Sequence, residues 1–185
     1  MLKLLKRIYR LILPKDPGQI EMDYLKKHGL RIGNNFHSFS PYAFDANWPW
    51  LISVGDDVTI SSNVKILAHD ASPLRVGMPT KIGCVDIGDN VFIGTGTIIL
   101  CNTRIGNNVI IGAGSVVSKS IPDNSVAAGN PAKVICSFDE YKTKHIKQMS
   151  DCVVFDSRRW YEWKDADPKE WEEMRNRLSG KHGYV

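Results

Sequence analysis

An aliphatic residue recurs every six positions through the middle of the chain, at Ile87, Ile93, Ile99, Ile105, Ile111 and Val117. Glycine follows this residue in several of the hexads, at Gly88, Gly94, Gly106 and Gly112. An α-helix repeats every 3.6 residues and a β-strand every two, so neither accounts for a period of six. A six-residue period predicts a parallel β-helix, in which each hexad forms one short face and three faces complete one coil.

The same spacing occurs earlier in the chain and predicts one further coil, built on Val54, Ile60 and Ile66. From Ile66 to Ile87 the chain advances by 21 residues, which is not a multiple of six. A segment must therefore leave the coil here, and residues 70–86 contain the prolines and glycines of such a loop. Residues 37–53, which are rich in aromatic residues, predict a second irregular segment.

The hexads must also turn the chain at the corners between faces. Asn and Gly tolerate the left-handed backbone that such corners often need. They stand at the turning positions of the hexads, at Asn35, Asn63, Asn90, Asn102, Asn108, Gly96 and Gly114. We therefore expect left-handed backbone at these residues.

The chain begins with a segment in which apolar and basic residues follow a helical period. A helix over Met1–Leu13 would carry five aliphatic residues on one face and four basic residues on the other. The first 15 residues carry a charge of +5, although the whole chain carries only +4. Such a helix could lie on an anionic membrane surface or pack on its own domain or trimer, and the sequence leaves both open.

Because the basic charge is confined to one end, the composition does not predict nucleic-acid binding. The four cysteines lack the close spacing of a zinc site, and neither a bound metal nor a disulfide framework is expected. Residues 2–13 are interrupted by basic residues and match neither a signal peptide nor a membrane span. We expect a cytoplasmic protein, with residues 1–13 as the candidate for peripheral contact with the inner face of the membrane.

The pattern divides the chain into three parts: an N-terminal helical segment (1–31), a β-helix domain (32–135) and a helical C-terminal extension (136–185). In the extension, Asp167 suits an N-cap and Pro168 the first position of a helix. The predicted fold class is therefore mainly β, a parallel β-helix of hexapeptide repeats with helical ends. The sequence assigns no role to the extension.

Two later segments carry a resemblance to a known family. Residues 111–117 read Ile-Gly-Ala-Gly-Ser-Val-Val, and residues 128–133 read Ala-Gly-Asn-Pro-Ala-Lys. With the other hexads, they make more than half of the chain resemble the hexapeptide-repeat acyltransferases, and most of all the maltose/galactoside and polysaccharide O-acetyltransferase branch. The resemblance implies a left-handed parallel β-helix, a homotrimer, acetyl-CoA as co-substrate and a saccharide acceptor.

The resemblance also implies which residues hold coenzyme A. Two of them would contact the pantetheine arm through their backbone, two would lie farther along the cofactor and one would face the phosphates: Thr95 and Ala113, Ser118 and Lys119, and Lys133. Close relatives often place another basic residue after this motif, where this chain has Cys136.

Transfer of an acetyl group to a hydroxyl needs a base, because an alcohol must lose its proton as it attacks. Histidine suits this task near neutral pH. Of the five histidines, only His69 follows a regular hexad at the start of the predicted loop, which is also the place of the family's catalytic histidine. The alternative is that His69 merely turns a corner. A carboxylate should orient the imidazole, and the candidates are Asp70 and Asp45, either of which could instead bind the acceptor.

Four aromatic residues, Tyr42, Phe44, Trp48 and Trp50, could form a platform for a sugar or cap the open end of the β-helix.

Other functions are compatible with the fold: N-acetylation of an amino or nucleotide sugar, a non-catalytic trimeric scaffold, or a metal-dependent hydratase of the γ-carbonic anhydrase kind. The hydratase needs three histidines, but only His37 and His69 lie in the core region. We therefore expect an O-acetyltransferase that moves acetyl directly from acetyl-CoA to a saccharide. Its expected role is in surface-polysaccharide synthesis.

Overall fold

The computed structural model describes residues 17–156 and 167–185. Contacts within the chain divide it into two units, Met1–Phe138 and Asp139–Val185. The helix expected over Met1–Leu13 lies outside the described residues.

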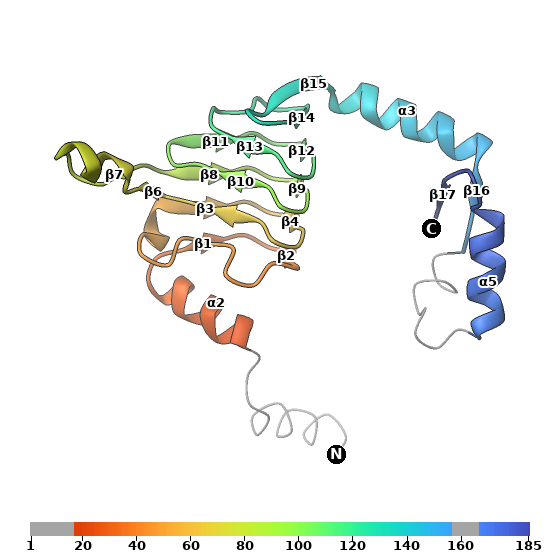
Figure 1. The fold of residues 1–185 in the computed structure, drawn as a ribbon, viewed down its shortest axis with the longest axis horizontal. Helices are drawn as coiled ribbons and strands as arrows, with labels where there is room; N and C mark the ends of the chain where they lie inside the picture. Colours follow the sequence, from red (N-terminus) through yellow and green to blue (C-terminus); the bar gives the residue numbers. More distant parts are fainter. Residues whose placement is uncertain (1–16, 157–166) are drawn as a thin grey trace, which may run out of the picture. The chain divides into compact units, whose positions relative to one another are not determined.

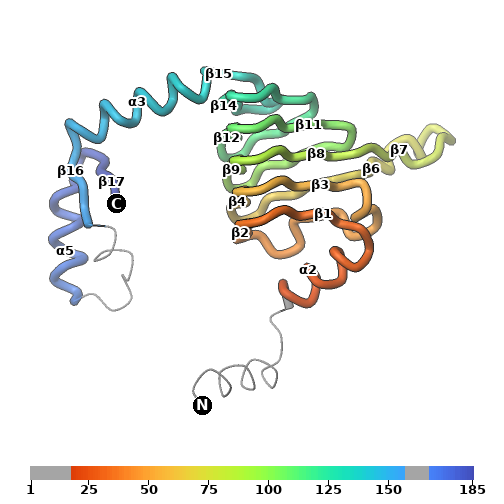
Figure 2. The backbone as a smooth tube through the Cα atoms, turned by 180° about the vertical axis from the view of Figure 1, so that it is seen from behind, coloured from red at the N-terminus to blue at the C-terminus, as the bar shows by residue number. Residues whose placement is uncertain are grey.

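The first unit is built from three stacks of short strands, which Figures 1 and 2 show from opposite sides. Sheet 1 contains β1 (Arg31–Ile32), β3 (Ile52–Val54), β8 (Val85–Ile87) and β11 (Thr103–Ile105). Sheet 2 contains β2 (His37–Ser38), β4 (Thr59–Ile60), β9 (Val91–Ile93), β12 (Val109–Ile111), β14 (Ser125–Ala128) and the antiparallel β15 (Lys133–Ser137). Sheet 3 contains β5 (Lys65–Ile66), β10 (Ile98–Ile99) and β13 (Val116–Val117). From β8 to β13 the chain visits the three sheets in turn, as the six-residue period predicts.

The aliphatic residues of the hexads stack in register from coil to coil and form the core. In sheet 2, Ile93 lies between Ile60 and Ile111, and all three are fully buried. The residue between two inward positions turns outward, as Phe92 does in strand β9. Each buried side chain therefore packs on its equivalent in the next coil, and this stacking explains why the period is kept so strictly.

The backbone is left-handed at all seven predicted corner residues, with φ from 51° to 72°. It is left-handed at Tyr42, Asp57 and Asn124 as well, which the sequence did not predict. The asparagines also join successive coils, because Asn90 Nδ2 donates to Asn108 Oδ1 at 2.8 Å. Asn at a corner therefore supplies both a tolerated conformation and a hydrogen bond between coils.

Helix α2 (Pro17–Lys27) lies at the end of the stack beside the first coil (Figure 1), within the segment 1–31 that the sequence divides off as helical, although the individual helix was expected only over Met1–Leu13. Pro17 suits the first helical position, where the missing N–H has no partner to lose. Leu25 in the helix and Leu30 just after it are buried in the core cluster. The helix thus covers apolar side chains that the first coil would otherwise expose.

Two segments leave the regular coils. The first contains antiparallel strands β6 (His69–Asp70) and β7 (Lys81–Ile82) around the 3-10 helix η2 (Ser72–Val76), in the part of the chain where the six-residue period is interrupted. The expectation of irregular structure over 37–53 is only partly correct. Strand β2 begins this segment, Phe44 bridges to Ile66 of sheet 3, and the 3-10 helix η1 (Pro49–Leu51) leads into β3.

The second unit contains most of helix α3 (Phe138–Asp151), helix α5 (Pro168–Arg177) and a strand pair, β16 (Val153–Val154) with β17 (Gly183–Tyr184). Asp167 caps α5 as predicted, because its side chain accepts the N–H of Lys169 at 2.9 Å. Phe155 is buried, and the guanidinium carbon of Arg177 lies 4.7 Å from its ring centroid. The strand pair was not predicted, because strands of two residues leave no periodic pattern.

Candidate active site

His69 and Asp45 meet at the base of the segment that leaves the second coil. The bridge between Phe44 and Ile66 places residue 45 beside the start of this segment, and the N–H of Asp45 donates to the carbonyl of Ile66 at 2.9 Å. Asp45 Oδ2 and His69 Nδ1 are in hydrogen-bonding contact. Pairing between the first two coils therefore brings together two residues that are far apart in the sequence.

Backbone groups fix the carboxylate of Asp45 on both of its oxygens. Oδ2 also accepts the N–H of Ala68 at 3.0 Å, and Oδ1 accepts the N–H of Asn47 at 3.1 Å. The side chain of Asp45 is 2% exposed, whereas that of His69 is 28% exposed. With Asp45 ionised, this contact requires a proton on Nδ1 of His69, and a neutral imidazole then has its lone pair on Nε2. This arrangement suits an imidazole base that a carboxylate orients.

Asp70, the other candidate carboxylate, has a different partner. It is exposed and accepts the N–H of Ser72 at 2.9 Å, at the start of η2. This hydrogen bond lowers the pKa of Asp70 below its ordinary value. The idea that His69 turns a hexad corner is wrong: it begins strand β6 and is absent from the left-handed positions, because the chain runs outward here instead of continuing to the next face.

The residues assigned to pantetheine lie at one corner of the prism. Thr95 and Ala113 precede β10 and β13 of sheet 3, one coil apart, and the N–H of Gly114 donates to the carbonyl of Thr95 at 2.8 Å. Both side chains are exposed. The segment before Lys133 continues this corner, because the N–H of Ala132 donates to the carbonyl of Val116 at 2.8 Å.

Ser118 and Lys119 lie at the opposite end of β13 and are exposed. Backbone hydrogen bonds between coils align this end of β13 with the start of the segment that leaves the second coil at β6. The N–H of Leu100 donates to Val117 and that of Leu67 donates to Ile99, each at 2.9 Å. His69 therefore lies toward the C-terminal ends of the strands of sheet 3, as do Ser118 and Lys119. The other three residues, Thr95, Ala113 and Lys133, lie toward the N-terminal ends of these strands.

The four aromatic residues do not form one cluster with a common role. Phe44 is buried in the core, Trp48 is half-buried, and Tyr42 and Trp50 are exposed. Tyr42 has a φ of 55°, which is uncommon for an aromatic residue. Its N–H donates to Glu21 Oε2 at 3.0 Å and its carbonyl accepts from Lys65 Nζ at 2.8 Å. Sequence reasoning missed Glu21, because nothing in the sequence relates helix α2 to this turn.

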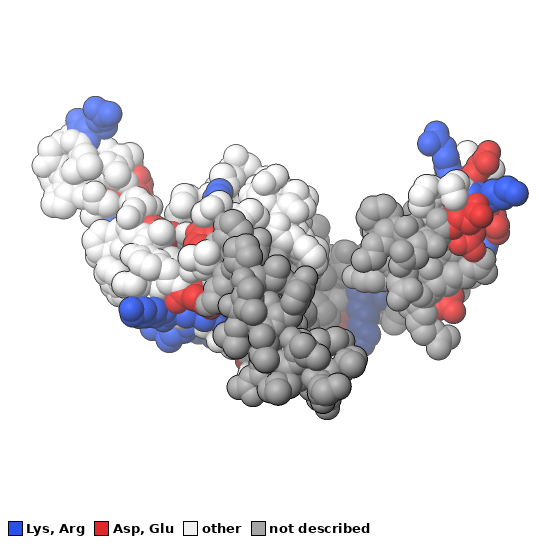
Figure 3. All heavy atoms as spheres, turned by 90° about the horizontal axis from the view of Figure 1, so that it is seen from below, with Lys and Arg blue, Asp and Glu red and all other residues white. Residues whose placement is uncertain are grey.

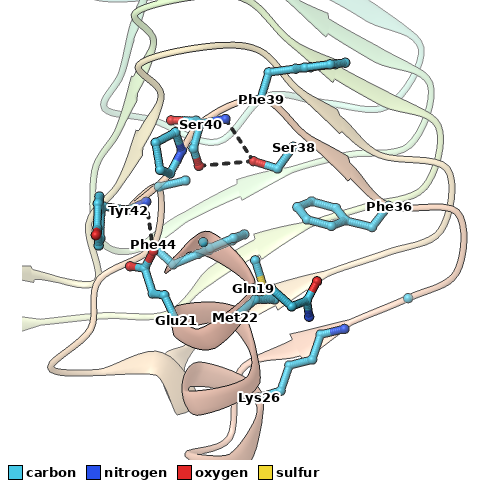
Figure 4. A pocket seen from close by; sticks show the side chains of 14 residues that line it. Gln19, Glu21, Met22, Lys26, Phe36, Ser38, Phe39, Ser40, Tyr42 and Phe44 are labelled. Atoms are coloured by element: carbon cyan, nitrogen blue, oxygen red, sulfur yellow. Dashed lines mark hydrogen bonds between the residues drawn. The ribbon is translucent and has the colours of Figure 1, made fainter. Parts of the chain in front are cut away.

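A cavity of about 760 Å³ lies between α2 and residues 36–44 (Figure 4). Met22, Phe36 and Phe44 supply apolar walls, and Glu21 and Lys26 supply charged ones. Neither member of the His69 and Asp45 pair lines this cavity. It is therefore separate from the candidate catalytic groups.

Within the described ranges, no three His, Cys, Asp or Glu side chains lie close enough together to hold a metal ion. The same part of the chain contains no helix with the length and apolar character needed to cross a membrane.

Comparisons with known proteins agree with this geometry. Residues 85–119 match the family described as Bacterial transferase hexapeptide (six repeats). Protein CapG of Staphylococcus aureus is 42% identical over 141 residues, which cover 73% of this chain and 81% of CapG. A solved maltose O-acetyltransferase from Clostridium difficile 630 is 32% identical, with a TM-score of 0.54, over 73% of this chain and 84% of that protein. A solved galactoside acetyltransferase in complex with coenzyme A is 26% identical, with a TM-score of 0.53, over 70% of this chain and 76% of that protein.

The chain therefore belongs to the hexapeptide-repeat acetyltransferases. The left-handed parallel β-helix that the resemblance implied is the fold of this family, and the expected enzyme class, acyltransferase, is confirmed.

Proposed function

We propose that this protein transfers the acetyl group of acetyl-CoA to a hydroxyl of a saccharide, with His69 as the general base and Asp45 as the residue that orients it. The observation that carries the proposal is the contact between the buried carboxylate of Asp45 and the partly exposed imidazole of His69. The maltose and galactoside acetyltransferases among the similar structures support a sugar as acceptor and coenzyme A as carrier.

The reaction proceeds by direct attack in a ternary complex. Nε2 of His69 takes the proton of the acceptor hydroxyl as its oxygen attacks the thioester carbonyl. The tetrahedral intermediate then collapses, the carbon–sulfur bond breaks, and the coenzyme A thiolate receives the proton from the imidazolium. Asp45 stabilises that imidazolium and keeps the proton of the resting imidazole on Nδ1. No acyl-enzyme forms, so no nucleophilic Cys or Ser is required.

Coenzyme A lies along the two ends of the strands of sheet 3. The backbone at Thr95 and Ala113 contacts its pantetheine arm, Ser118 and Lys119 lie farther along it, and Lys133 attracts the phosphates as a point charge. The exposure of these five residues supports the assignment, which otherwise rests on the family motif. Cys136 replaces the additional base of many relatives, so Lys133 carries more of the phosphate recognition here.

The active form is a homotrimer whose subunits meet about sheet 3. In support, two of the three outward residues in the strands of this sheet are apolar, Ile98 and Val116, and the third is Lys65, whereas sheet 1 turns Asp86 and Arg104 outward. A threefold axis facing sheet 3 places the C-terminal strand ends of this sheet beside the N-terminal strand ends of sheet 3 in the next subunit. His69 of one copy then approaches Thr95 and Ala113 of another.

Two variants of the same coil test the trimer. Val116→Glu, on sheet 3, should shift the mass in light scattering from trimer to monomer and abolish turnover. Arg104→Glu, on sheet 1, introduces the same side chain and should change neither. A wild-type protein that is monomeric at micromolar concentration would refute the trimer.

The proposed setting is the cytoplasm, where acetyl-CoA is available, and the proposed role is the modification of a surface polysaccharide or its precursor. The test is thiol release from acetyl-CoA with a panel of mono- and oligosaccharides. Release should depend on the acceptor and should fall at least ~10²-fold in His69→Ala, as expected for the loss of a general base. His37→Ala, at an exposed histidine of strand β2, is the matched control and should retain activity. Equal activity of both variants would overturn the base assignment.

A further inference from the structure

Cys152 and His182 form a pair of side chains in the second unit that the proposed acetyl transfer does not use. Cys152 directly precedes β16 and His182 directly precedes β17, and these two strands pair in parallel, Val153 with Gly183. Neighbouring strands lie about 4.8 Å apart, so the pairing places the two residues side by side. Cys152 Sγ lies 3.3 Å from His182 Nε2, which is within hydrogen-bonding distance for sulfur.

Solvent can reach this pair, because Cys152 is half-buried and His182 is exposed. The other cysteines of the chain differ from Cys152. Within the described ranges none of them has a hydrogen bond to an imidazole, and Cys101 is buried. His145, the other histidine of the second unit, has a different partner, because its Nδ1 lies 2.9 Å from the hydroxyl of Tyr184. Among the described residues, Cys152 is therefore the thiol with a base in hydrogen-bonding contact.

A cysteine in contact with a histidine can act as a nucleophile. The thiolate is the reactive form of the side chain, and an imidazole in contact with the thiol can take its proton. In the contact between Cys152 and His182, the shared proton lies either on sulfur or on Nε2. The second form is a thiolate held by an imidazolium, and a thiolate attacks disulfides.

We propose that Cys152 is a modification site, which forms a mixed disulfide with a small disulfide such as glutathione disulfide. His182 Nε2 takes the thiol proton, and the thiolate of Cys152 attacks one sulfur of the disulfide. The disulfide bond breaks, and a new bond joins Cys152 to one glutathione. The other glutathione leaves as a thiolate, which takes the proton from His182. Cys152 is thereby oxidised, and the leaving glutathione is reduced.

The overall charge of the second unit does not explain this reactivity. Residues 139–185 contain ten Lys or Arg and ten Asp or Glu, so their formal side-chain charges sum to zero and do not attract an anionic glutathione. Figure 3 shows basic and acidic side chains mixed on this unit. The reactivity therefore comes from the contact with His182. It does not depend on the proposed acetyl transfer, because the pair contains none of the residues assigned to that reaction.

Site-resolved mass spectrometry of the full-length protein tests the modification. The protein reacts with glutathione disulfide at pH 7, and the adduct at each cysteine is followed over time after an acid quench and digestion. An ordinary thiol is about 3% ionised at pH 7. A thiol whose pKa lies near the ambient pH is about half ionised, and its weaker nucleophilicity offsets about fivefold of this roughly 16-fold gain. We therefore expect His182→Gln to slow the modification of Cys152 by about threefold.

Cys84, which is exposed in the first unit, is the internal reference, and its rate should be the same in both proteins. The matched control, His145→Gln, changes an imidazole that contacts Tyr184 and should leave the rate at Cys152 unchanged. In concentrated urea, where the contact is lost, the wild type and His182→Gln should react equally. The proposal is overturned if Cys152 forms no adduct, if His182→Gln does not slow it, if His145→Gln slows it equally, or if the difference persists in urea.

Discussion

Replacing Asp45 by Asn tests whether the carboxylate acts through its charge or only through its place in the fold. The side chain keeps its size but holds one oxygen and one NH2 group, and the NH2 group cannot accept the hydrogen bonds that both carboxylate oxygens now receive. Ala68 is fully buried, whereas Asn47 is exposed. An unpaired buried N–H costs about 1–3 kcal/mol, so the amide oxygen should stay on Ala68 and the NH2 group should turn toward Asn47, where water can replace the lost partner.

In that orientation the amide oxygen still accepts from Nδ1 of His69, so the imidazole keeps its tautomer and loses only the negative charge beside it. The difference between a charged and a neutral hydrogen-bond partner, about 1–1.5 kcal/mol, gives a decrease in kcat of about tenfold as a lower bound. The Coulomb energy of a pair 4 Å apart near the protein surface, about 4 kcal/mol, gives about 10³-fold as an upper bound. We therefore expect kcat for acetyl transfer to fall by between ~10-fold and ~10³-fold, while KM for both substrates changes less than about twofold.

Steady-state thiol release over a range of acetyl-CoA and acceptor concentrations measures both constants, and urea unfolding corrects for any loss of folded protein. Asp45→Ala should reduce kcat further, because it also frees the imidazole and leaves the N–H of Ala68 unpaired. Asp70→Asn is the matched control, since its carboxylate contacts the loop and not His69. A decrease in kcat of less than about threefold for Asp45→Asn, or an effect confined to KM, would refute the reasoning.

Other predictions concern the β-helix and its loop. Ile93→Ala should lower the free energy of unfolding by about 2–5 kcal/mol in urea titrations at fixed protein concentration, because it leaves a cavity between two coils, while exposed Phe92→Ala should cost less. Asn90→Ala should cost about 1–2 kcal/mol at its φ of 54°, and Asn90→Gly should cost less in the same titration. Because the pKa of Asp70 is lowered in the folded protein, its bond to Ser72 stabilises the loop above about pH 4 and is lost as the pH falls below this. Amide exchange at Ser72, corrected for intrinsic rates, should become less protected in that window, and Asp70→Asn should remove the change.

The regular part of this fold could be predicted because one physical requirement repeats along the chain. Every coil buries equivalent positions and turns at equivalent corners, so Ile93 and Asn90 are each one instance of a pattern that appears many times. Helix α2 has no such repetition. Its buried side is defined by contact with a coil that follows it in sequence, as for Leu25, and a single amphipathic stretch of 11 residues gives a weak signal.

The candidate site shows the same limit more sharply. His69 could be selected from the sequence because the interruption of the hexads marks where the chain leaves the coil. Its partner could not be chosen, because Asp70 is adjacent in sequence and Asp45 is not. Only the pairing of the first coil with the second, through Phe44 and Ile66, determines which carboxylate reaches the imidazole. The position of a base follows from a local break in a periodic pattern, whereas its orienting partner follows from the stacking of coils, and a mechanism that needs both therefore depends on the folded chain.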